Sequence, residues 1–332
     1  MSSLTRPSVH VRRAPGAGTS TLAQDVRAGL AQTFKELPAK HLYDAYGSQL
    51  FDEICGLPEY YPTRTERAIL EARADDIAAR TEATELVEFG AGTAAKTRVL
   101  LDALRSAGTL AGYIPFDIEE TVLRATALRL TREYPELRVI EAVVGDFEHD
   151  INLIPPPPAG GRRMVALLGG TIGNFVTSPR RSLLKSIATL LGPEGHLLLG
   201  ADLVKDPELI ESAYNDAAGV TARFNRNVLT IINRELDADF PVESFEHIAF
   251  YDRQQEWIEM RLRASVACRV SIRALEMEIE FQAGEEIRTE ISAKFTPQRL
   301  VDDLSASGLS AVELMTDQNH LFALVLARPR PA

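Results

Sequence analysis

Two periodicities of apolar residues alternate between about residues 65 and 204, and together they predict an α/β fold. Short runs rich in Val, Leu and Ile are typical of strands that are buried on both faces of a parallel sheet. Amphipathic segments with helical spacing separate these runs. The expected strands are residues 84–89, 112–118, 137–147, 162–175 and 196–204, and the expected helices are residues 65–80, 96–108, 119–135 and 178–195.

Two regions interrupt this alternation and predict a second domain. Residues from about 20 to 63 precede the first strand, and residues from about 202 to 293 contain a long helical stretch followed by β-like segments. The last apolar run, residues 320–327, returns to the sheet pattern. We therefore expect a disordered tail and two domains, with a ligand crevice between the domains at the carboxyl ends of the sheet strands. The expected ranges are residues 1–20 for the tail, residues 64–201 plus 294–332 for a doubly wound α/β sheet domain, and residues 21–63 plus 202–293 for an α+β domain.

Composition narrows the classes of function. The net charge of −11 opposes nucleic-acid binding, which depends on clustered cations. Only two cysteines are present, Cys55 and Cys268, which predicts a reduced cytoplasmic protein rather than a disulfide framework. No apolar run is long enough for a membrane span, and the six histidines lack metal-ligand spacing. We expect a cytoplasmic monomer that needs no metal and binds neither membranes nor nucleic acid.

The segment VEFGAGTAAKT, residues 87–97, follows an expected strand and is compatible with three ligands. As G-x-G-x-x-A, with Gly90, Gly92 and Ala95, it resembles a dinucleotide loop. As a phosphate-binding P-loop it has Ala95 where a glycine is expected, which weakens that interpretation. As a G-x-G after an acidic strand end, it suits S-adenosylmethionine. The loop alone leaves the ligand open.

Residues after the loop favour S-adenosylmethionine. Asp117 lies about 20 residues further on, where an acid binds ribose hydroxyls in both nicotinamide and S-adenosylmethionine folds. Asp146 and Phe147 end the third strand, where an acid can accept from the adenine amino group and an aromatic ring can cover the adenine. Lys96 can pair with the methionine carboxylate, or it is a surface lysine in the first turn of a helix. The spacing thus predicts a methyltransferase, with a nicotinamide oxidoreductase as the alternative.

Longer segments carry a more specific resemblance. They are KHLYDAYGSQLFDEICGLPEYYPTRTE, GGTIGNF, ADLVKD, AYNDAAGVTARFNRNVL and GEEIRTEISAKF. From about Asp25 to the C-terminus, the chain resembles the histidine Nα-methyltransferases of ergothioneine biosynthesis. The resemblance implies a Rossmann-like methyltransferase domain with a dedicated substrate domain. It also implies transfer of three methyl groups from S-adenosylmethionine to the α-amine of histidine, which gives hercynine.

The resemblance assigns residues to two groups. The implied donor-binding residues are Gly90, Lys96, Asp117, Asp146 and Phe147. The implied histidine-binding residues are Tyr43, Tyr60, Asn174, Tyr214, Met260, Glu290 and Ser292. Within the second group, Tyr43 is expected near the acceptor amine as the catalytic residue, Asn174 and Tyr214 at the carboxylate and amine end, and the last three around the imidazole. Ala91 and Gly170 depart from the family, which often has serine at both positions.

Strand periodicity in IRTEISAK supports the imidazole pocket. A period of two places Arg288, Glu290, Ser292 and Lys294 on one face. A carboxylate that accepts from a ring N–H, and a hydroxyl for the other nitrogen, suit an imidazole. Without the resemblance, an exposed polar strand face explains the same pattern.

Plainer explanations also exist for the other residues. Tyr43 and Tyr60 suit a trimethylated amine, because aromatic faces attract quaternary ammonium ions, but tyrosines are also found at a core edge. Asn174 is also typical of a turn, and Met260 and Tyr214 of core packing. Three alternative functions remain open from sequence: methylation of another amino acid such as tryptophan, nicotinamide-dependent oxidoreduction, and ligand binding without catalysis.

Overall fold

The computed structural model describes residues 8–13, 22–137 and 139–331. The chain divides into two compact units, and each unit is assembled from separate stretches of the chain. Unit 1 comprises Met1–Thr19, Pro62–Val204 and Phe295–Ala332, and unit 2 comprises Ser20–Tyr61 and Lys205–Lys294.

Unit 1 is built on a sheet that has eight strands within the described residues. In spatial order these are β1 (Ser8–Arg13), β5 (Val139–Val144), β4 (Gly112–Asp117), β3 (Glu85–Phe89), β6 (Arg163–Leu167), β7 (His196–Asp202), β14 (Phe322–Pro329) and β13 (Leu309–Thr316). Neighbouring strands from β1 to β7 are parallel, and β14 is antiparallel to both β7 and β13. Strand order reverses between β3 and β6, which confirms the predicted doubly wound, Rossmann-like α/β sheet.

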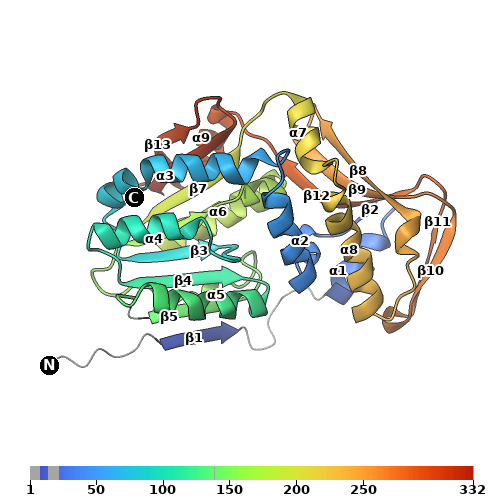
Figure 1. Ribbon diagram of the computed structural model, residues 1–332, viewed down its shortest axis with the longest axis horizontal. Helices are drawn as coiled ribbons and strands as arrows, with labels where there is room; N and C mark the ends of the chain where they lie inside the picture. The colour runs from blue at the N-terminus through green and yellow to red at the C-terminus, as the bar shows by residue number, and fades with distance from the viewer. Residues whose placement is uncertain (1–7, 14–21, 138, 332) are drawn as a thin grey trace. The chain divides into compact units, whose positions relative to one another are not determined.

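Helices cover both faces of this sheet, because alternate strand residues are apolar on each face. One core cluster joins Leu86, Tyr113 and Met164 of the strands to three helices, α3 (Tyr61–Thr81), α4 (Thr97–Ser106) and α5 (Glu120–Glu133). Helix α6 (Thr177–Leu191) packs against β6, β7, β13 and β14, and α9 (Pro297–Ala306) packs against α6 and β13. Figure 1 shows these elements around the central strands. Two short 3₁₀ helices, η2 (Ile151–Leu153) and η3 (Thr171–Asn174), complete the unit.

The expected disordered tail is wrong for part of its length. Residues 8–13 form β1, which pairs in parallel with β5 at the edge of the sheet. Its sequence SVHVRR alternates, and Val9 and Val11 pack against the core cluster. Its arginines Arg12 and Arg13 form ion pairs with Glu141 and Glu120. The rest of the predicted tail, residues 1–7 and 14–20, lies outside the described residues.

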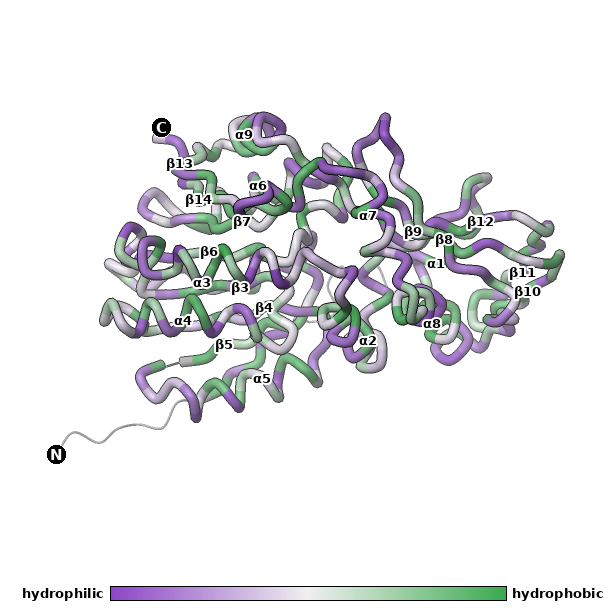
Figure 2. Tube along the Cα trace, turned by 45° about the horizontal axis from the view of Figure 1, so that its top comes forward, coloured by the Kyte–Doolittle hydropathy of each residue, from purple (hydrophilic) through white to green (hydrophobic). Residues whose placement is uncertain are grey.

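Unit 2 combines a small sheet with helices, in agreement with the expected α+β architecture of the second domain. The four-stranded sheet has the order β2 (Lys35–Glu36), β12 (Glu286–Ala293), β9 (Trp257–Ala264) and β8 (Phe245–Asp252), and a hairpin is formed by β10 (Cys268–Ile272) and β11 (Met277–Phe281). The helices are α1 (Leu22–Leu30), η1 (Ala39–Leu42), α2 (Ala45–Cys55), α7 (Pro207–Tyr214), α8 (Val220–Glu235), η4 (Val242–Ser244) and η5 (Arg273–Leu275). Helix α8 packs against α2, β8 and β9, and its alternating hydropathy in Figure 2 follows from this burial of one side.

Membrane insertion has no support in the described helices, since none is both long and apolar enough to cross a bilayer.

Candidate active site

The carboxyl ends of neighbouring strands in unit 1 bring the predicted donor-binding residues together. Gly90 directly follows β3, Asp117 ends β4, and Asp146 comes two residues after β5. Because β5, β4 and β3 are adjacent and parallel, these residues lie along one edge of the sheet. Asn174 ends η3 after β6, the next strand, and so belongs to the same edge. This is the edge at which doubly wound sheets bind ligands.

The loop after β3 has a backbone that favours glycine. Gly90 has φ +71° and Gly92 has φ +48°, both in the left-handed region that side chains with a Cβ disfavour. The amide of Gly92 donates to Asp117 Oδ2 at 2.8 Å. Burial raises the pKa of Asp117, whereas the backbone amides of Gly92, Glu119 and Ile118 oppose that rise. The acid and the loop are therefore held against one another.

Lys96 is held by a residue that the sequence analysis missed. Its ammonium pairs with Glu66 of α3, a carboxylate whose side chain is fully buried. Glu66 also accepts from the Gly169 amide, at 2.8 Å to Oε1 and 2.9 Å to Oε2. The available signal was its position three and four residues before Ile69 and Leu70, on the apolar side of the helix. Glu66 thereby links the lysine after the glycine loop to the turn after β6.

A second buried acid, Glu88, lies two residues before Gly90 of the same loop. Glu88 of β3 accepts a hydrogen bond from Thr97 Oγ1 at 2.5 Å and another from the Tyr113 hydroxyl. Burial raises the pKa of Glu88 to about 7, although both hydroxyls lower it. Thr97 is the first residue of α4, so this contact fixes the start of the helix to the strand.

Phe147 is part of an aromatic cluster. Its ring stacks on Phe89 with centroids 5.6 Å apart and an interplanar angle of 4°. The rings of Phe116 and Phe175 meet it edge to face, at 6.2 Å and 6.1 Å. Asp146 beside it is buried, and its Oδ1 accepts from the Glu148 amide. The predicted adenine-binding pair is therefore packed in a fixed position at the end of β5.

The three predicted tyrosines of unit 2 belong to one aromatic cluster. Tyr60 meets Tyr214 edge to face at 6.1 Å and Phe51 at the same distance. Tyr43 packs on Phe51 at 5.5 Å and on Phe224 at 5.3 Å. Burial raises the pKa of Tyr60 well above its ordinary value, and the charges of Tyr214, Cys55, Tyr43 and Glu290 raise it further. The Tyr60 phenol is therefore a neutral donor at physiological pH, close to the other residues of the group.

A β-bulge corrects the predicted face of the polar strand. Arg288 pairs with Arg261, whereas Glu290 pairs with Met260, so the pairing shifts between Arg288 and Glu290. Thr289 is the extra residue. Since directly paired residues share a face, Arg288 lies on the opposite face from Glu290. The expectation of one common face is therefore wrong for Arg288, and it holds for the residues after the bulge.

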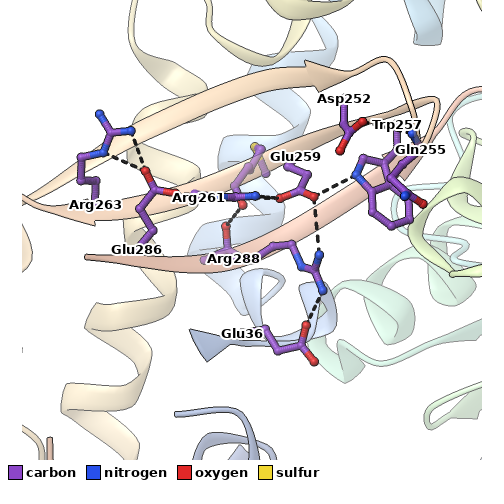
Figure 3. Close-up of polar contacts among 11 residues, drawn as sticks. Glu36, Asp252, Gln255, Trp257, Glu259, Arg261, Arg263, Glu286 and Arg288 are labelled. Atoms are coloured by element: carbon purple, nitrogen blue, oxygen red, sulfur yellow. Dashed lines mark hydrogen bonds and ion pairs between the residues drawn. The ribbon is translucent and has the colours of Figure 1, made fainter. Parts of the chain in front are cut away.

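Arg288 joins an ion-pair network on its own face (Figure 3). It contacts Glu36 and lies 3.5 Å from Glu259, which also accepts from Trp257 Nε1 at 2.9 Å. Arg261 bridges Glu259 and Glu286, both at 2.7 Å, and Arg263 contacts Glu286 at 2.8 Å. Each arginine of this network therefore has a carboxylate partner within it.

The other face carries Glu290, Ser292 and Met260, which are the residues predicted to bind the imidazole. Glu290 pairs with Met260 and Ser292 with Ile258 across β12 and β9, and Met260 and Ser292 are buried. Burial raises the pKa of Glu290 to about 7, and the charge of Lys294 opposes that rise. Lys294 is fully buried, with Nζ 3.0 Å from Ser292 Oγ and 3.1 Å from the Tyr214 hydroxyl. The structure thus adds Lys294 to the group.

Metal binding was not expected, and within the described residues no group of three His, Cys, Asp or Glu side chains is arranged to hold an ion.

Comparison with known proteins shows to which family the chain belongs. The matching family model describes histidine-specific, S-adenosylmethionine-dependent methyltransferases and covers residues 22–329. A histidine N-alpha-methyltransferase of Mycobacterium tuberculosis is 49% identical over 97% of this chain and 99% of its own. A protein of the same name from Mycolicibacterium smegmatis is 50% identical over 95% of this chain and 97% of its own. Ergothioneine biosynthesis protein 1 of Schizosaccharomyces pombe is 32% identical over 65% of this chain and 29% of its own. The chain therefore belongs to the histidine-specific, S-adenosylmethionine-dependent methyltransferase family.

Proposed function

We propose that the protein transfers three methyl groups from S-adenosylmethionine to the α-amine of L-histidine, giving N,N,N-trimethylhistidine (hercynine) for ergothioneine biosynthesis. The observation that carries the proposal is the arrangement of Glu290, Ser292 and Met260 on one face of the β12–β9 pair, where Met260 and Ser292 are buried and the charge of Glu290 acts on Tyr60 of the tyrosine cluster. An acid and a hydroxyl beside apolar walls match the two unlike nitrogens of an imidazole. An indole has no second ring nitrogen and leaves such polar groups unpaired, which sites of this kind reject strongly.

The donor residues suit S-adenosylmethionine, whose sulfonium supplies an activated methyl group when it is bound. We assign the ribose hydroxyls to Asp117, a carboxylate fixed by backbone amides at the end of β4. We assign the methionine carboxylate to Lys96, with Gly90 giving close backbone approach. The adenine is assigned to Asp146 and Phe147.

The acceptor residues must present a neutral amine in line with the donor methyl. Before each transfer a proton leaves the α-ammonium to solvent. The lone pair of the neutral amine then forms the new N–C bond as the S–C bond breaks and S-adenosylhomocysteine leaves. We assign Tyr43 to the reacting amine as the catalytic residue, with Tyr60 beside it, and Asn174 and Tyr214 to the carboxylate and amine end. Alignment of this kind contributes up to roughly 7–11 kcal/mol in well-oriented systems. Tyrosine faces also attract the trimethylated product by about 0.5–2 kcal/mol each.

The proposed setting is the cytoplasm, because Cys55 and Cys268 are thiols in the structure, which suits a reducing compartment. The expected monomeric state remains a prediction that sedimentation equilibrium would test.

Mass-resolved turnover tests the function. The purified protein is incubated with S-adenosylmethionine and all the standard amino acids, and products are searched for gains of one, two or three methyl groups. Trimethylated histidine as the sole product is the expected result, and Glu290→Ala is expected to abolish most of it. Methylation of tryptophan or another amino acid would contradict the assignment of Glu290 and Ser292. Donor binding without methylation would contradict catalysis itself.

A further inference from the structure

Lys294 is a lysine at a buried position, where a charged group lowers the stability of the fold. Its side chain is fully buried at the end of β12, and such an ammonium is stable only with hydrogen-bond partners and a compensating charge. Two partners are hydroxyls of the predicted histidine pocket, Ser292 Oγ at 3.0 Å and the Tyr214 hydroxyl at 3.1 Å. Nζ also lies 4.7 Å from the centre of the Tyr214 ring. The charge of Lys294 also favours the ionised form of Glu290, whose pKa burial raises.

The direction of these hydrogen bonds follows from the chemistry of an ammonium group. Lys294 has three donors and no acceptor, so Ser292 and Tyr214 must accept from it. Each hydroxyl keeps one hydrogen of its own, and that hydrogen must point away from the ammonium. Both side chains are therefore set as donors toward any further partner. Without Lys294, each hydroxyl is free to rotate and to accept instead.

Glu290 and Ser292 require opposite hydrogen-bonding roles of the two ring nitrogens of an imidazole. The carboxylate accepts only, so it selects a ring nitrogen that bears hydrogen. The Ser292 hydroxyl, directed as a donor, selects a ring nitrogen with a free lone pair. A doubly protonated ring has no such nitrogen, and its positive charge is repelled by the nearby ammonium.

We propose that Lys294 is a positioning residue that makes the pocket take the histidine side chain as a single neutral tautomer. It acts through Ser292, whose donor direction it sets, and through Tyr214, whose remaining hydrogen it directs toward the amino-acid backbone. The inference rests on the proposed function, because it takes histidine as the occupant of this pocket. It adds the protonation state that is recognised and the residue that enforces it.

Nitrogen NMR of bound histidine tests the proposal. Histidine labelled with ¹⁵N in the ring is bound to the full chain with S-adenosylhomocysteine present, and the ring is followed from pH 5.5 to 8.5. Without histidine the pKa of Glu290 is about 7, and a bound ring N–H favours its ionised form, so binding should lower that pKa. We therefore expect one protonated and one bare ring nitrogen throughout, even below the ordinary imidazole pKa of about 6.5. Equal population of two tautomers, or a ring that titrates as it does free in solution, would overturn the proposal.

Lys294→Met removes the ammonium while keeping an unbranched chain of similar length. The bare nitrogen is expected to take up a proton at higher pH in this variant, and histidine affinity at pH 8 is expected to fall by roughly 10-fold or more, as for loss of a charged hydrogen bond. Lys294→Arg should retain part of the tautomer preference. Lys185→Met, at an exposed lysine of α6, serves as the matched control and should change neither the titration of the bound ring nor the affinity for histidine. An unchanged ring titration in folded Lys294→Met would contradict the assignment.

The outcomes separate this inference from the function on which it rests. If the unaltered chain neither binds nor methylates histidine, the proposed function fails. If it makes trimethylhistidine but binds the ring in mixed tautomers, only the role of Lys294 fails. Should Lys294→Met not fold, the spectra of the unaltered complex and of Lys294→Arg decide the question, and identical ring titration in both would contradict the role of Lys294.

Discussion

Glu290 is a proposed binding residue whose ionised form destabilises the folded chain. Its pKa is raised to about 7 because burial disfavours the carboxylate. Between its ordinary value of 4.5 and about 7, the folded chain retains a proton that the unfolded chain releases. The free energy of unfolding therefore falls as the pH rises through this window, and the lost stability is not regained above pH 7. The ionised acid that suits a ring N–H is thus the destabilising form.

Glu290→Gln is expected to separate stability from function. At pH 8 the variant should be more stable than the unaltered protein by up to roughly 3 kcal/mol, the equivalent of a shift of about 2.5 pKa units. Near pH 4.5 the two proteins should be equally stable. Urea unfolding at both pH values measures this, and kcat/KM for histidine should fall at least 10-fold. Glu278→Gln, at an exposed residue of β11, is the control, and a gain that is the same at both pH values would contradict the explanation.

Single residues also show what the sequence could and could not predict. Glu290 and Ser292 were placed in one pocket by strand period and resemblance, and the structure puts both on the Met260 face. Glu66 and Glu88 were missed, because a charged residue in a helix or strand is exposed by default. Their burial depends on Lys96 and Gly169 for the first, and on hydroxyls for the second. Such partners meet only in the folded chain, so local pattern does not reveal them.

At the scale of elements, the bulge in β12 decides which side chains reach the pocket. Regular alternation keeps Arg288 and Glu290 on one face, and the extra Thr289 separates them. Thr289 is buried, and its hydroxyl lies 2.5 Å from Asn225 Oδ1 of α8 and 3.1 Å from the Met260 carbonyl. Asn225 Nδ2 in turn donates to His247 Nδ1, whose Nε2 contacts the Tyr214 carbonyl at 2.9 Å. No residue type in IRTEISAK signals a bulge, because its anchor lies on another element.

Thr289→Val tests this anchor by removing a hydroxyl without changing side-chain shape. Loss of the bond to buried Asn225 should destabilise the protein by about 1–3 kcal/mol. Histidine affinity should also fall, because Glu290 is the next residue along the strand. Denaturant unfolding and calorimetric titration measure the two effects. Thr189→Val, at an exposed threonine of α6, is the matched control, and an equally small effect at both positions would show that the bulge does not depend on this bond.

At the scale of the molecule, the residues proposed to bind the donor and those proposed to bind the acceptor lie mainly in different units. All five proposed donor residues lie in unit 1, and most of the acceptor residues lie in unit 2, with Asn174 as the exception. The periodicity of apolar residues and the spacing of the motifs predicted the glycine loop and the edge of the sheet at which it lies. How the two segments of unit 2 meet is harder to predict, because they are joined by long-range contacts such as the pairing of β2 with β12 and the packing of α2 on α8.

Hydrogen exchange tests this division of ligands. S-adenosylhomocysteine alone is expected to slow exchange in peptides covering residues 87–97 and 112–118. Addition of histidine should slow exchange in peptides covering 257–264 and 286–293. Asp117→Ala should remove the first effect, and Glu290→Ala the second. Protection of the β12 peptide by the donor product alone, retained in Glu290→Ala, would contradict the assignment.

The pairing of β14 with β7 also bears on how the chain is made. β7 is complete at Asp202, but its partner on one side begins only at Phe322, after the whole of Lys205–Lys294 has been synthesised. Until then a long apolar edge of the nascent sheet has no neighbour, and such edges invite pairing with other chains. Phe322, Leu324 and Leu326 are also part of the core that this sheet shares with its helices. The sheet of unit 1 is therefore completed only after Lys205–Lys294 has been made, and the second unit is synthesised while the first is still open.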